Sequence, residues 1–376
     1  MKSYSIEKRK DNKPGNAIVI IINSLYPGGA ERLVIDDINM LLDRDVDVRL
    51  ITLRAEKPGA SFADALHKSH LQWQTICFQN LFDFFAWIRL WRLLYSWHPR
   101  AVVTHLWLAN TVGRITAWLA GVRMIVAFEQ NVYERTKSRR HFRVDWLLAK
   151  ISTHIVAVTY EARNSLIRHG IPERKISVIS SAINIRRYER LESKGIRTKL
   201  GYPERAFIFI WIGRFIRQKA VDVLLRAFAK LQNGLLILVG DGEEREILQQ
   251  LAAELHIEKQ VRFLGFQNDV REFLAAGDCF VLPSRWEGLP VALLEAMAAG
   301  KPIIAGDIEG IREAVTQAKN AILVRPDDVE SLAAAMRSMM ADNALRARLS
   351  QASIIRAKDF SIESHTDQLL KLLGYS

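Results

Sequence analysis

The sequence is poor in the residues from which disulfide scaffolds and metal sites are built. Its 376 residues include two cysteines, Cys77 and Cys279, and each stands among apolar neighbours. We therefore expect two buried free thiols in a reducing compartment rather than a disulfide. No group of Cys or His residues has the spacing of a zinc site, so no metal site is expected.

Long hydrophobic runs are absent as well. No stretch of about 18 or more uncharged apolar residues occurs, which argues against a transmembrane helix. Residues 1–16 are basic and precede the apolar run AIVIIINSLY, an order that also occurs in signal peptides. No cleavage site of small residues follows, and GGAER indicates a loop that opens a helix, so we expect a first buried strand here.

Acidic residues are scarce in one half of the chain. Residues 1–200 carry 32 Lys and Arg against 18 Asp and Glu, whereas the remainder carries 21 against 23. The net charge of +12 therefore arises in the first half. Such an asymmetry indicates an anionic surface or substrate at that half, although a basic surface that only favours solubility explains part of any such excess.

Apolar, β-rich runs alternate with segments of helical periodicity along the chain. This alternation predicts parallel sheets covered by helices on both faces. The pattern restarts at AFIFIWIGRF after a polar, charged stretch, so we place a domain boundary near Ser193. Ligands of such folds bind at the carboxyl ends of strands, which puts the site in the cleft between two such domains. The predicted strands are AIVIII, DVRLITL, AVVTH, MIVAFE, HIVAV, ISVIS, AFIFIWI, LLILVG, VRFLG, CFVL and PIIA.

The segment SRWEGLPVALLEAMAAG holds two glutamates in otherwise apolar surroundings. We expect a helix over Pro290–Ala299, because Pro suits a first helical turn and Gly follows the end. Glu295 is its only charged residue, and a carboxylate on a buried helix needs hydrogen-bond donors or a cation. Glu287 lies in the loop before it, where the amides of Gly288 and Leu289 form an anion site. The alternative is one ordinary surface Glu and one capping or ion-paired Glu.

Two cations follow the strand AFIFIWI. In GRFIRQKA, Arg214 and Lys219 extend over the strand end from the loop and the next helix start. Two cations beside a helix N-terminus suit a diphosphate, but a pair of surface cations is equally common. The next strand end, LVGDGEE, gives a tight turn without the G-x-G-x-x-G pattern of dinucleotide sites. Its Asp241 is a ligand contact or, at least as often, a helix cap.

The first half offers weaker candidates at its own strand ends. Gly28 and Gly29 in NSLYPGGAER let the backbone approach a ligand closely, or form a plain tight turn. His105 in THLWLAN stands at a strand end, the functional edge of such a sheet, although a lone His is more often structural. The polar residues 129–131 of FEQN taken alone indicate an ordinary surface loop.

Together these segments resemble glycosyltransferase family 4, whose members are retaining, nucleotide-sugar-dependent enzymes of GT-B fold. The similarity extends from about Ile18 to the end of the chain. It rests on GGAER, HLWLANTVGRITAWLAGV, IGRFIRQKAVDVLLRAF, LVGDGE, VRFLGF and VLPSRWEGLPVALLEAMAAGKPIIAGDIEGIREAV, in the order typical of the family. The resemblance implies an α/β protein of two doubly wound, Rossmann-like domains that face each other across a cleft. The implied units are an acceptor-binding domain over 1–192, a nucleotide-sugar-binding domain over 193–359, and a C-terminal helix at about 360–376 that packs back onto the first.

The resemblance also implies roles for the residues named above. Glu295 is expected to hold the ribose hydroxyls, and Glu287 and His105 are the expected catalytic residues beside the transferred sugar. The other expected contacts to the donor are Gly29, Arg214, Lys219, Asp241, Phe266, Gly288 and Leu289. Fixed cations and amides stabilise the charge that develops on the leaving nucleoside diphosphate, so neither a metal nor another cofactor is expected.

The chain departs from the family pattern at four places. Ala220 stands where Gly is common after the Lys, and SAIN at 181–184 replaces NGID in the linker. EGIRE, which begins at Glu309, replaces GGIPE, and EQN replaces EHN. The changes at Glu309 and in the linker leave the donor sugar and the hinge undecided.

The expected function is that of a cytoplasmic retaining glycosyltransferase. It moves a sugar from a nucleotide sugar, with UDP favoured over GDP, to a glycan or lipid-linked acceptor in cell-surface polysaccharide or lipopolysaccharide synthesis. The alternatives are another GT-B enzyme, such as a nucleotide-sugar epimerase, and a non-enzymatic binder of anionic polymers suggested by the basic composition. A polymer binder has no use for Glu287 and Glu295, so nucleic acid is not an expected partner.

An aromatic segment indicates a surface through which the protein approaches the membrane that carries a lipid-linked acceptor. DFFAWIRLWRLLYSWH, residues 83–98, is expected as a helix that is either core or membrane-facing. The i, i+3, i+4, i+7 spacing predicts one shared face, made of Phe84, Trp87, Ile88, Trp91, Leu94 and Tyr95. Together with the basic run 135–143, this segment indicates peripheral binding to the anionic inner face of the cytoplasmic membrane.

Overall fold

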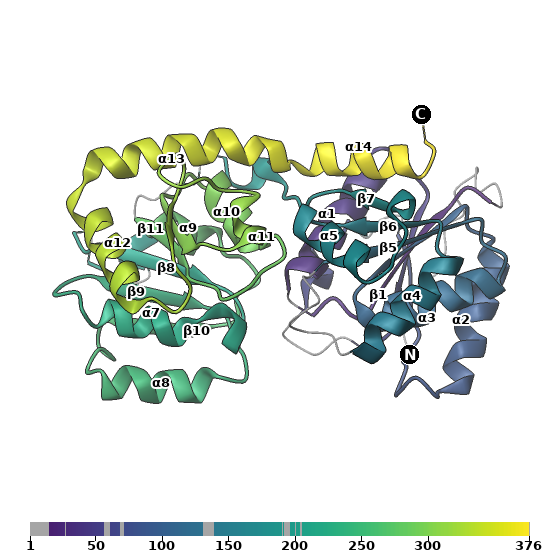
Figure 1. Ribbon diagram of the computed structural model, residues 1–376, viewed down its shortest axis with the longest axis horizontal. Helices are drawn as coiled ribbons and strands as arrows, with labels where there is room; N and C mark the ends of the chain where they lie inside the picture. Colours follow the sequence, from purple (N-terminus) through teal and green to yellow (C-terminus); the bar gives the residue numbers. More distant parts are fainter. Residues whose placement is uncertain are drawn as a thin grey trace.

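Two parallel sheets, one in each half of the chain, lie side by side in the computed structural model (Figure 1). The structure describes residues 15–26, 28–55, 61–67, 71–130, 139–189, 191, 196–199, 201–203 and 205–375. The expected boundary near Ser193 and residues 135–138 of the basic run lie outside these residues, and so do the first fourteen residues.

The first sheet has the strand order β3-β2-β1-β4-β5-β6-β7, and all its strand pairs are parallel. The order reverses between β1 and β4, which is the mark of a doubly wound sheet. Its strands are β1 (Ile18–Ile22), β2 (Val48–Thr52), β3 (Gln72–Thr75), β4 (Ala101–His105), β5 (Met124–Glu129), β6 (His154–Ala157) and β7 (Ile176–Val178). Its helices are α1 (Gly29–Asp43), α2 (Phe84–Trp97), α3 (Trp107–Leu119), α4 (Arg139–Ile151) and α5 (Tyr160–Arg168).

Helices cover both faces of this sheet because its strands are apolar on both sides. In β1, Ile18 and Ile20 pack with the side chains of α1, whereas Val19 and Ile21 pack with those of α2 and α3. Alternate residues of a strand point to opposite faces, so a continuous apolar run such as IVIII serves two cores at once.

The second sheet repeats this plan in the order β10-β9-β8-β11-β12-β13, with the reversal between β8 and β11. Its strands are β8 (Ile208–Ile212), β9 (Leu235–Val239), β10 (Val261–Gly265), β11 (Cys279–Leu282), β12 (Ile303–Gly306) and β13 (Ile322–Val324). The helices of this half are α6 (Ile196–Lys199), α7 (Val221–Phe228), α8 (Arg245–Glu254), α9 (Arg271–Ala276), α10 (Val291–Ala298), α11 (Glu309–Arg312), α12 (Val329–Ala341) and α13 (Asn343–Ala357). Two doubly wound sheets that face each other constitute the GT-B fold expected from the sequence.

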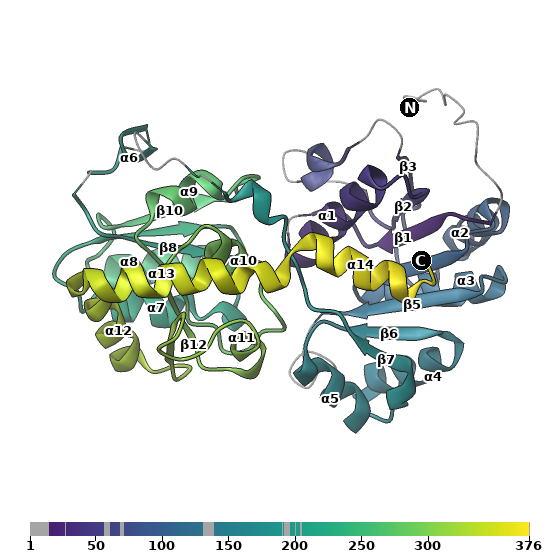
Figure 2. The same cartoon turned by 90° about the horizontal axis from the view of Figure 1, so that it is seen from above.

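The chain crosses back to the first half at its end. Helix α13 runs along the second half and α14 (Ile362–Leu372) continues over the first, as Figure 2 shows from above. At the crossing, the Ile183 amide donates to the Phe360 carbonyl at 3.0 Å and the Ile362 amide donates to the Ile183 carbonyl at 2.9 Å. The outgoing and returning segments are thus hydrogen-bonded to each other where they pass between the two halves.

One sequence expectation was wrong: Cys279 is buried in β11, but Cys77 is exposed. The sequence left open whether the shared face of α2 meets the core. The buried residues of α2 are Ala86, Leu90 and Leu94, so Leu94 is the one buried member of that predicted face. Its aromatic members at the two ends of the helix, Phe84 and Tyr95, are 67% and 54% exposed. Within the described residues, no helix has both the length and the apolar composition needed to cross a bilayer.

A buried ion pair holds α14 against α1. His365 Nε2 lies 3.2 Å from Asp37 Oδ2, both side chains are 1% exposed, and the Thr366 hydroxyl donates to Asp37 Oδ1 at 3.0 Å. Burial lowers the pKa of His365, but the charge of Asp37 and the hydrogen bonds to Asp37 and Ser180 outweigh it and raise that pKa above its ordinary value.

We predict that His365→Ala lowers the free energy of unfolding by about 3 kcal/mol at about pH 6, because Asp37 then remains buried without its cation. The difference should shrink toward about pH 9, since a raised pKa stabilises the fold only while the imidazole is protonated. Denaturant titration at both pH values measures it. The control is His67→Ala, because His67 pairs with Asp43 at 3.3 Å while more than half exposed, and such a pair contributes little. A loss that is equal at both pH values would show that His365 acts through packing alone.

Candidate active site

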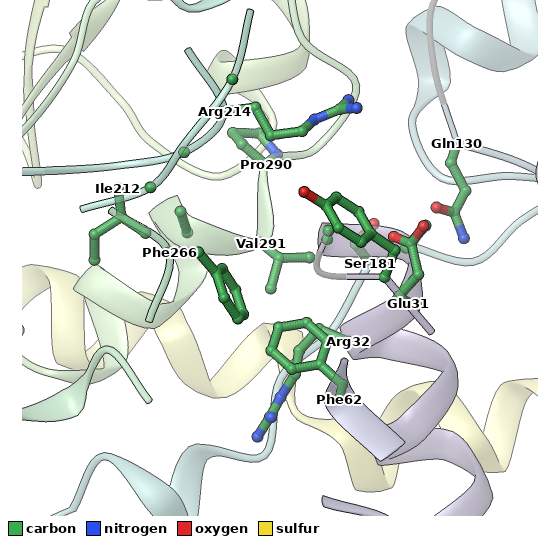
Figure 3. Close-up of a pocket in the computed structure, with 18 of the residues that line it drawn as sticks. Glu31, Arg32, Phe62, Gln130, Ser181, Ile212, Arg214, Phe266, Pro290 and Val291 are labelled. Atoms are coloured by element: carbon green, nitrogen blue, oxygen red, sulfur yellow. The ribbon is translucent and has the colours of Figure 1, made fainter. Parts of the chain in front are cut away.

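A cleft of about 910 Å³ lies between the carboxyl edges of the two sheets. Its lining comes from the segments after β1, β2, β4, β5 and β7 in the first half and from the loops after β8, β9, β10 and β11 in the second. Figure 3 shows side chains of both halves directed toward each other across it. In each sheet the strands beside the cleft flank the point where the strand order reverses, which is the usual ligand site of doubly wound folds.

Most of the residues expected at the site do line this cleft. They are Gly29, Arg214, Lys219, Asp241, Phe266, Glu287, Gly288, Leu289 and Glu295. Gly29 stands at a close approach of the two halves, because a Cβ at this position would lie 3.2 Å from Cγ2 of Val291. The starts of α1 and α10 therefore meet, and a residue with a Cβ would require Val291 to shift by a few tenths of an ångström.

The wall after β8 and β11 carries the expected cations. Lys219 Nζ lies 2.5 Å from Glu287 Oε1, and Gln218 donates to Glu287 Oε2 at 3.0 Å. Glu287 is 6% exposed, and this pairing compensates its burial. Arg214 is exposed and extends into the cleft (Figure 3). The arrangement offers one cation that is already paired and one that is open to solvent.

The backbone at Ala220 explains why Gly is common at this position in the family. Ala220 adopts φ 51° and ψ 41°, the left-handed region, as it joins the turn η5 (Arg217–Lys219) to α7. A residue with a Cβ is strained there by about 1–2 kcal/mol relative to the right-handed region. The left-handed conformation at Ala220, and with it the turn that carries Lys219, is therefore retained in spite of this strain.

Glu295 stands in the middle of α10 and also lines the cleft. It is 9% exposed on α10, and the Tyr188 hydroxyl donates to its Oε1 at 2.6 Å. Burial raises the pKa of Glu295 to about 7, against the hydrogen bond from Tyr188 and the charge of Arg32, which lower it. The carboxylate expected to hold the ribose therefore titrates at a higher pH than an ordinary Glu.

His105 stands behind the cleft wall rather than on it. It is 1% exposed, stacks on Phe128 with ring centroids 4.5 Å apart, and is absent from the cleft lining. Its Nδ1 lies 3.1 Å from Nε2 of Gln130, which does line the cleft. Burial lowers the pKa of His105 to about 3, so its imidazole is neutral at physiological pH. In this structure His105 reaches the site through Gln130.

Asp241 lines the cleft and does not cap α8, whose N-cap residue is Glu244. Its Oδ1 accepts from the Gly242 amide at 2.9 Å and its Oδ2 pairs with Arg245 at 3.0 Å. The turn itself requires Gly240, because φ is +140° and a Cβ there would lie 1.8 Å from the Gly213 carbonyl oxygen. This close approach brings the ends of β8 and β9 together beneath the cleft.

Several cleft residues were not singled out from the sequence. The Phe62 ring lies 6.1 Å from that of Phe266 across the cleft, Arg32 lies over Phe62, and Trp107 and Tyr188 are also in the lining. Phe62 and Tyr188 come from irregular segments, where no periodic pattern points to a function. Gln130 was visible only as part of EQN.

No metal centre is found among the residues that the structure describes, since no three His, Cys, Asp or Glu side chains come together there. The positive charge that the described part of the cleft offers to a ligand comes from cationic side chains and helix amides.

Two family models match the chain, and they divide it in the same way as the two sheets. Residues 27–187 match Glycosyltransferase Family 4, and residues 192–356 match Glycosyl transferases group 1. A curated relative is 30% identical over 347 residues, which are 92% of this chain and 94% of the relative: the lipopolysaccharide core biosynthesis glycosyltransferase LpsD of Rhizobium meliloti (strain 1021). The chain belongs to glycosyltransferase family 4.

Other matches to this glycosyltransferase extend over nearly its whole length. The UDP-Gal:alpha-D-GlcNAc-diphosphoundecaprenol alpha-1,3-galactosyltransferase of Escherichia coli is 28% identical over 92% of this chain and 93% of its own. Among solved structures, Anabaena Alr3699/HepE in complex with UDP and glucose superposes with a TM-score of 0.86, at 22% identity, over 95% of this chain and 99% of its own. The structural likeness is one of fold, and it agrees with the GT-B arrangement described above.

We predict that Arg214→Ala weakens the binding of UDP by about tenfold or more, because a hydrogen bond to a charged group contributes about 1.5–3 kcal/mol. Isothermal calorimetry with UDP, and with uridine as the ligand that lacks the diphosphate, measures the effect. Arg217→Ala is the matched control, since Arg217 is exposed in the same loop but does not line the cleft. Equal affinities of the two variants for UDP would place the diphosphate elsewhere.

Proposed function

We propose that this glycosyltransferase transfers a sugar from a UDP-sugar to a glycan or lipid-linked acceptor with retention of anomeric configuration. The observation that carries the proposal is that one cleft combines groups that bind anions with carboxylates that bind hydroxyl groups. Cations and helix amides stand after β8 and β11, and two buried carboxylates, Glu287 and Glu295, flank them. A nucleotide sugar presents the matching groups, namely a diphosphate, a ribose and a hexose rich in hydroxyl groups.

The proposed diphosphate site consists of Arg214, Lys219 and the amides of Gly288 and Leu289, all of which line the cleft. Negative charge grows on the diphosphate as the bond to the sugar breaks, and donors that are already fixed stabilise it without reorganisation. Lys219 is bound to Glu287 before any donor arrives. A diphosphate at Lys219 would share the ammonium with Glu287, which places that carboxylate next to the sugar end of the donor.

The first half supplies the proposed acceptor side. The neutral His105 imidazole orients Gln130, which is at the cleft surface, and Trp107 at the start of α3 offers a 38% exposed ring. The names of two relatives, a lipopolysaccharide core glycosyltransferase and a galactosyltransferase acting on a diphosphoundecaprenol acceptor, support an acceptor in cell-surface glycan synthesis. Retention is the stereochemistry that the resemblance to the family implies.

The test of this function is transfer from radiolabelled UDP-sugars to membrane lipid extracts, with EDTA present or absent. We predict transfer at equal rates in both cases, because Arg214, Lys219 and helix amides supply the positive charge that a metal ion would otherwise supply. NMR of the product should show the α configuration of the donor. Hydrolysis or epimerisation without transfer would favour another enzyme of GT-B fold. Loss of activity on chelation that magnesium restores would contradict the metal-free mechanism.

We further propose that the enzyme works on the cytoplasmic side of the membrane and binds it peripherally through α2 and the end of α3. Trp91 and Tyr95 stack with ring centroids 5.5 Å apart, and Trp91 Nε1 donates to the Leu119 carbonyl, which joins the two helices. This aromatic patch consists of Phe82, Phe84, Phe85, Trp91, Tyr95, Trp118 and Leu119, which are 37–93% exposed. The exposed cations Arg89 and Arg92 stand on the same helix. Aromatic rings with nearby cations suit the interface of an anionic bilayer.

We predict that the protein sediments with liposomes containing anionic lipid and that high salt reduces this binding. The double change Arg89→Ser and Arg92→Ser should weaken it by about 1 kcal/mol per residue, or roughly tenfold to thirtyfold in all. Lys259→Ser with Arg337→Ser removes the same charge from exposed positions of the second half and serves as the control. Equal binding of both double variants, or equal binding to neutral vesicles, would contradict this membrane surface.

A further inference from the structure

The carboxylate of Glu295 accepts a hydrogen bond from Tyr188, a partner that no sequence pattern predicts. Tyr188 follows the turn η4 (Ile185–Arg187), on the segment that leaves the first half of the chain. Its hydroxyl donates to Glu295 Oε1 at 2.6 Å, and both residues line the cleft. Tyr188 is 5% exposed, so its ring is held in the core and packing fixes the position of its hydroxyl oxygen.

The hydrogen bond engages only half of the carboxylate. Among the described residues, Oε1 of Glu295 accepts from Tyr188 and no hydrogen bond to Oε2 occurs. An ionised carboxylate has about four acceptor positions on its two oxygens, so the contact with Tyr188 leaves most of them open. Because Glu295 also lines the cleft, these open positions are available to a ligand with hydroxyl groups.

The surroundings make this carboxylate sensitive to the loss of one donor. No other charged residue stands on α10. From neighbouring elements, Arg32 lowers the pKa of Glu295, whereas Asp36 on α1 and Asp269 before α9 raise it. Arg32 also lies 3.5 Å from Asp36, so its charge is shared. The pKa of Tyr188 is raised well above its usual value by burial, so the hydroxyl remains a donor throughout the neutral and mildly basic range.

We propose that Tyr188 is a positioning residue for the donor: its hydroxyl holds one oxygen of Glu295 so that the other faces the ribose hydroxyls. This inference rests on the proposed function, in which a nucleotide sugar binds with its ribose at Glu295. Tyr188 does not touch the reacting atoms. It fixes the rotamer of Glu295 and favours its ionised form, because a hydrogen bond to a carboxylate stabilises the charged state.

The test compares Tyr188→Phe with wild type in calorimetry, using UDP and 2′,3′-dideoxy-UDP at several pH values. Removal of the hydroxyl takes away a contact that lowers the pKa of Glu295, so that pKa should rise. As the pH is lowered, the variant should therefore lose ribose binding at a higher pH than wild type does. A rise of about one unit from about 7 predicts UDP binding about fivefold weaker at about pH 7 and nearly unchanged at about pH 9. The dideoxy compound has the same diphosphate and no ribose hydroxyls, so its affinity should not differ between the two proteins.

Two further variants separate positioning from general stability. Tyr202→Phe removes the hydroxyl of another tyrosine whose ring belongs to the same core, away from the cleft, and should leave the affinity for UDP unchanged at every pH. Glu295→Gln should remove the pH dependence of ribose binding, and Tyr188→Phe should then weaken binding no further.

Wild-type affinity of Tyr188→Phe for UDP across the pH range would overturn the inference. An equal loss for UDP and the dideoxy compound would also overturn it, because the hydroxyl would then serve only the fold. A wild-type protein that binds neither UDP nor another nucleoside diphosphate would instead refute the proposed function, and with it the inference.

Discussion

The active-site geometry depends on the place where the chain crosses between its two sheets. There the backbone of Ile183 pairs with that of Phe360 and Ile362, so the outgoing and returning segments are held together. Helix α14 then anchors the return on α1 through the buried Asp37–His365 pair. Because the carboxyl edges of both sheets face each other across this crossing, loops that are remote in sequence form a common cleft. The same crossing delivers Tyr188 to Glu295.

The buried carboxylates of the cleft are each paired with other groups of the protein. Glu287 is paired with Lys219 and Gln218, and Glu295 accepts from Tyr188. In the proposed function, a nucleotide sugar engages the same groups. The donor would then replace or share existing contacts instead of ordering free side chains.

Much of the fold was predictable because its strands are apolar on both faces and its helices are amphipathic. The expected runs from AIVIII to PIIA correspond to β1, β2 and β4 to β12. The edge strands β3 and β13 were missed. They are short, and QWQT in β3 is polar and half-exposed, so no apolar pattern marks it. The surroundings of α2 stayed open for a related reason: aromatic spacing shows which residues share a face, but it cannot tell whether core or solvent meets that face. Cys77 was wrongly expected to be buried because apolar neighbours in the sequence do not show whether a side chain faces the core or solvent.

The sequence by itself determined the family, the doubly wound sheets, and the local strand–loop–helix units that carry Arg214, Lys219, Glu287 and Glu295. These depend on residues close together in the chain, where periodicity, glycines and helix ends act directly. Only the tertiary structure decided what faces those residues. It set His105 behind Gln130 and brought Phe62 against Phe266. It also gave Glu295 a hydroxyl partner 107 residues away. Contacts between distant segments follow from how two packed domains meet, and no local pattern encodes that meeting.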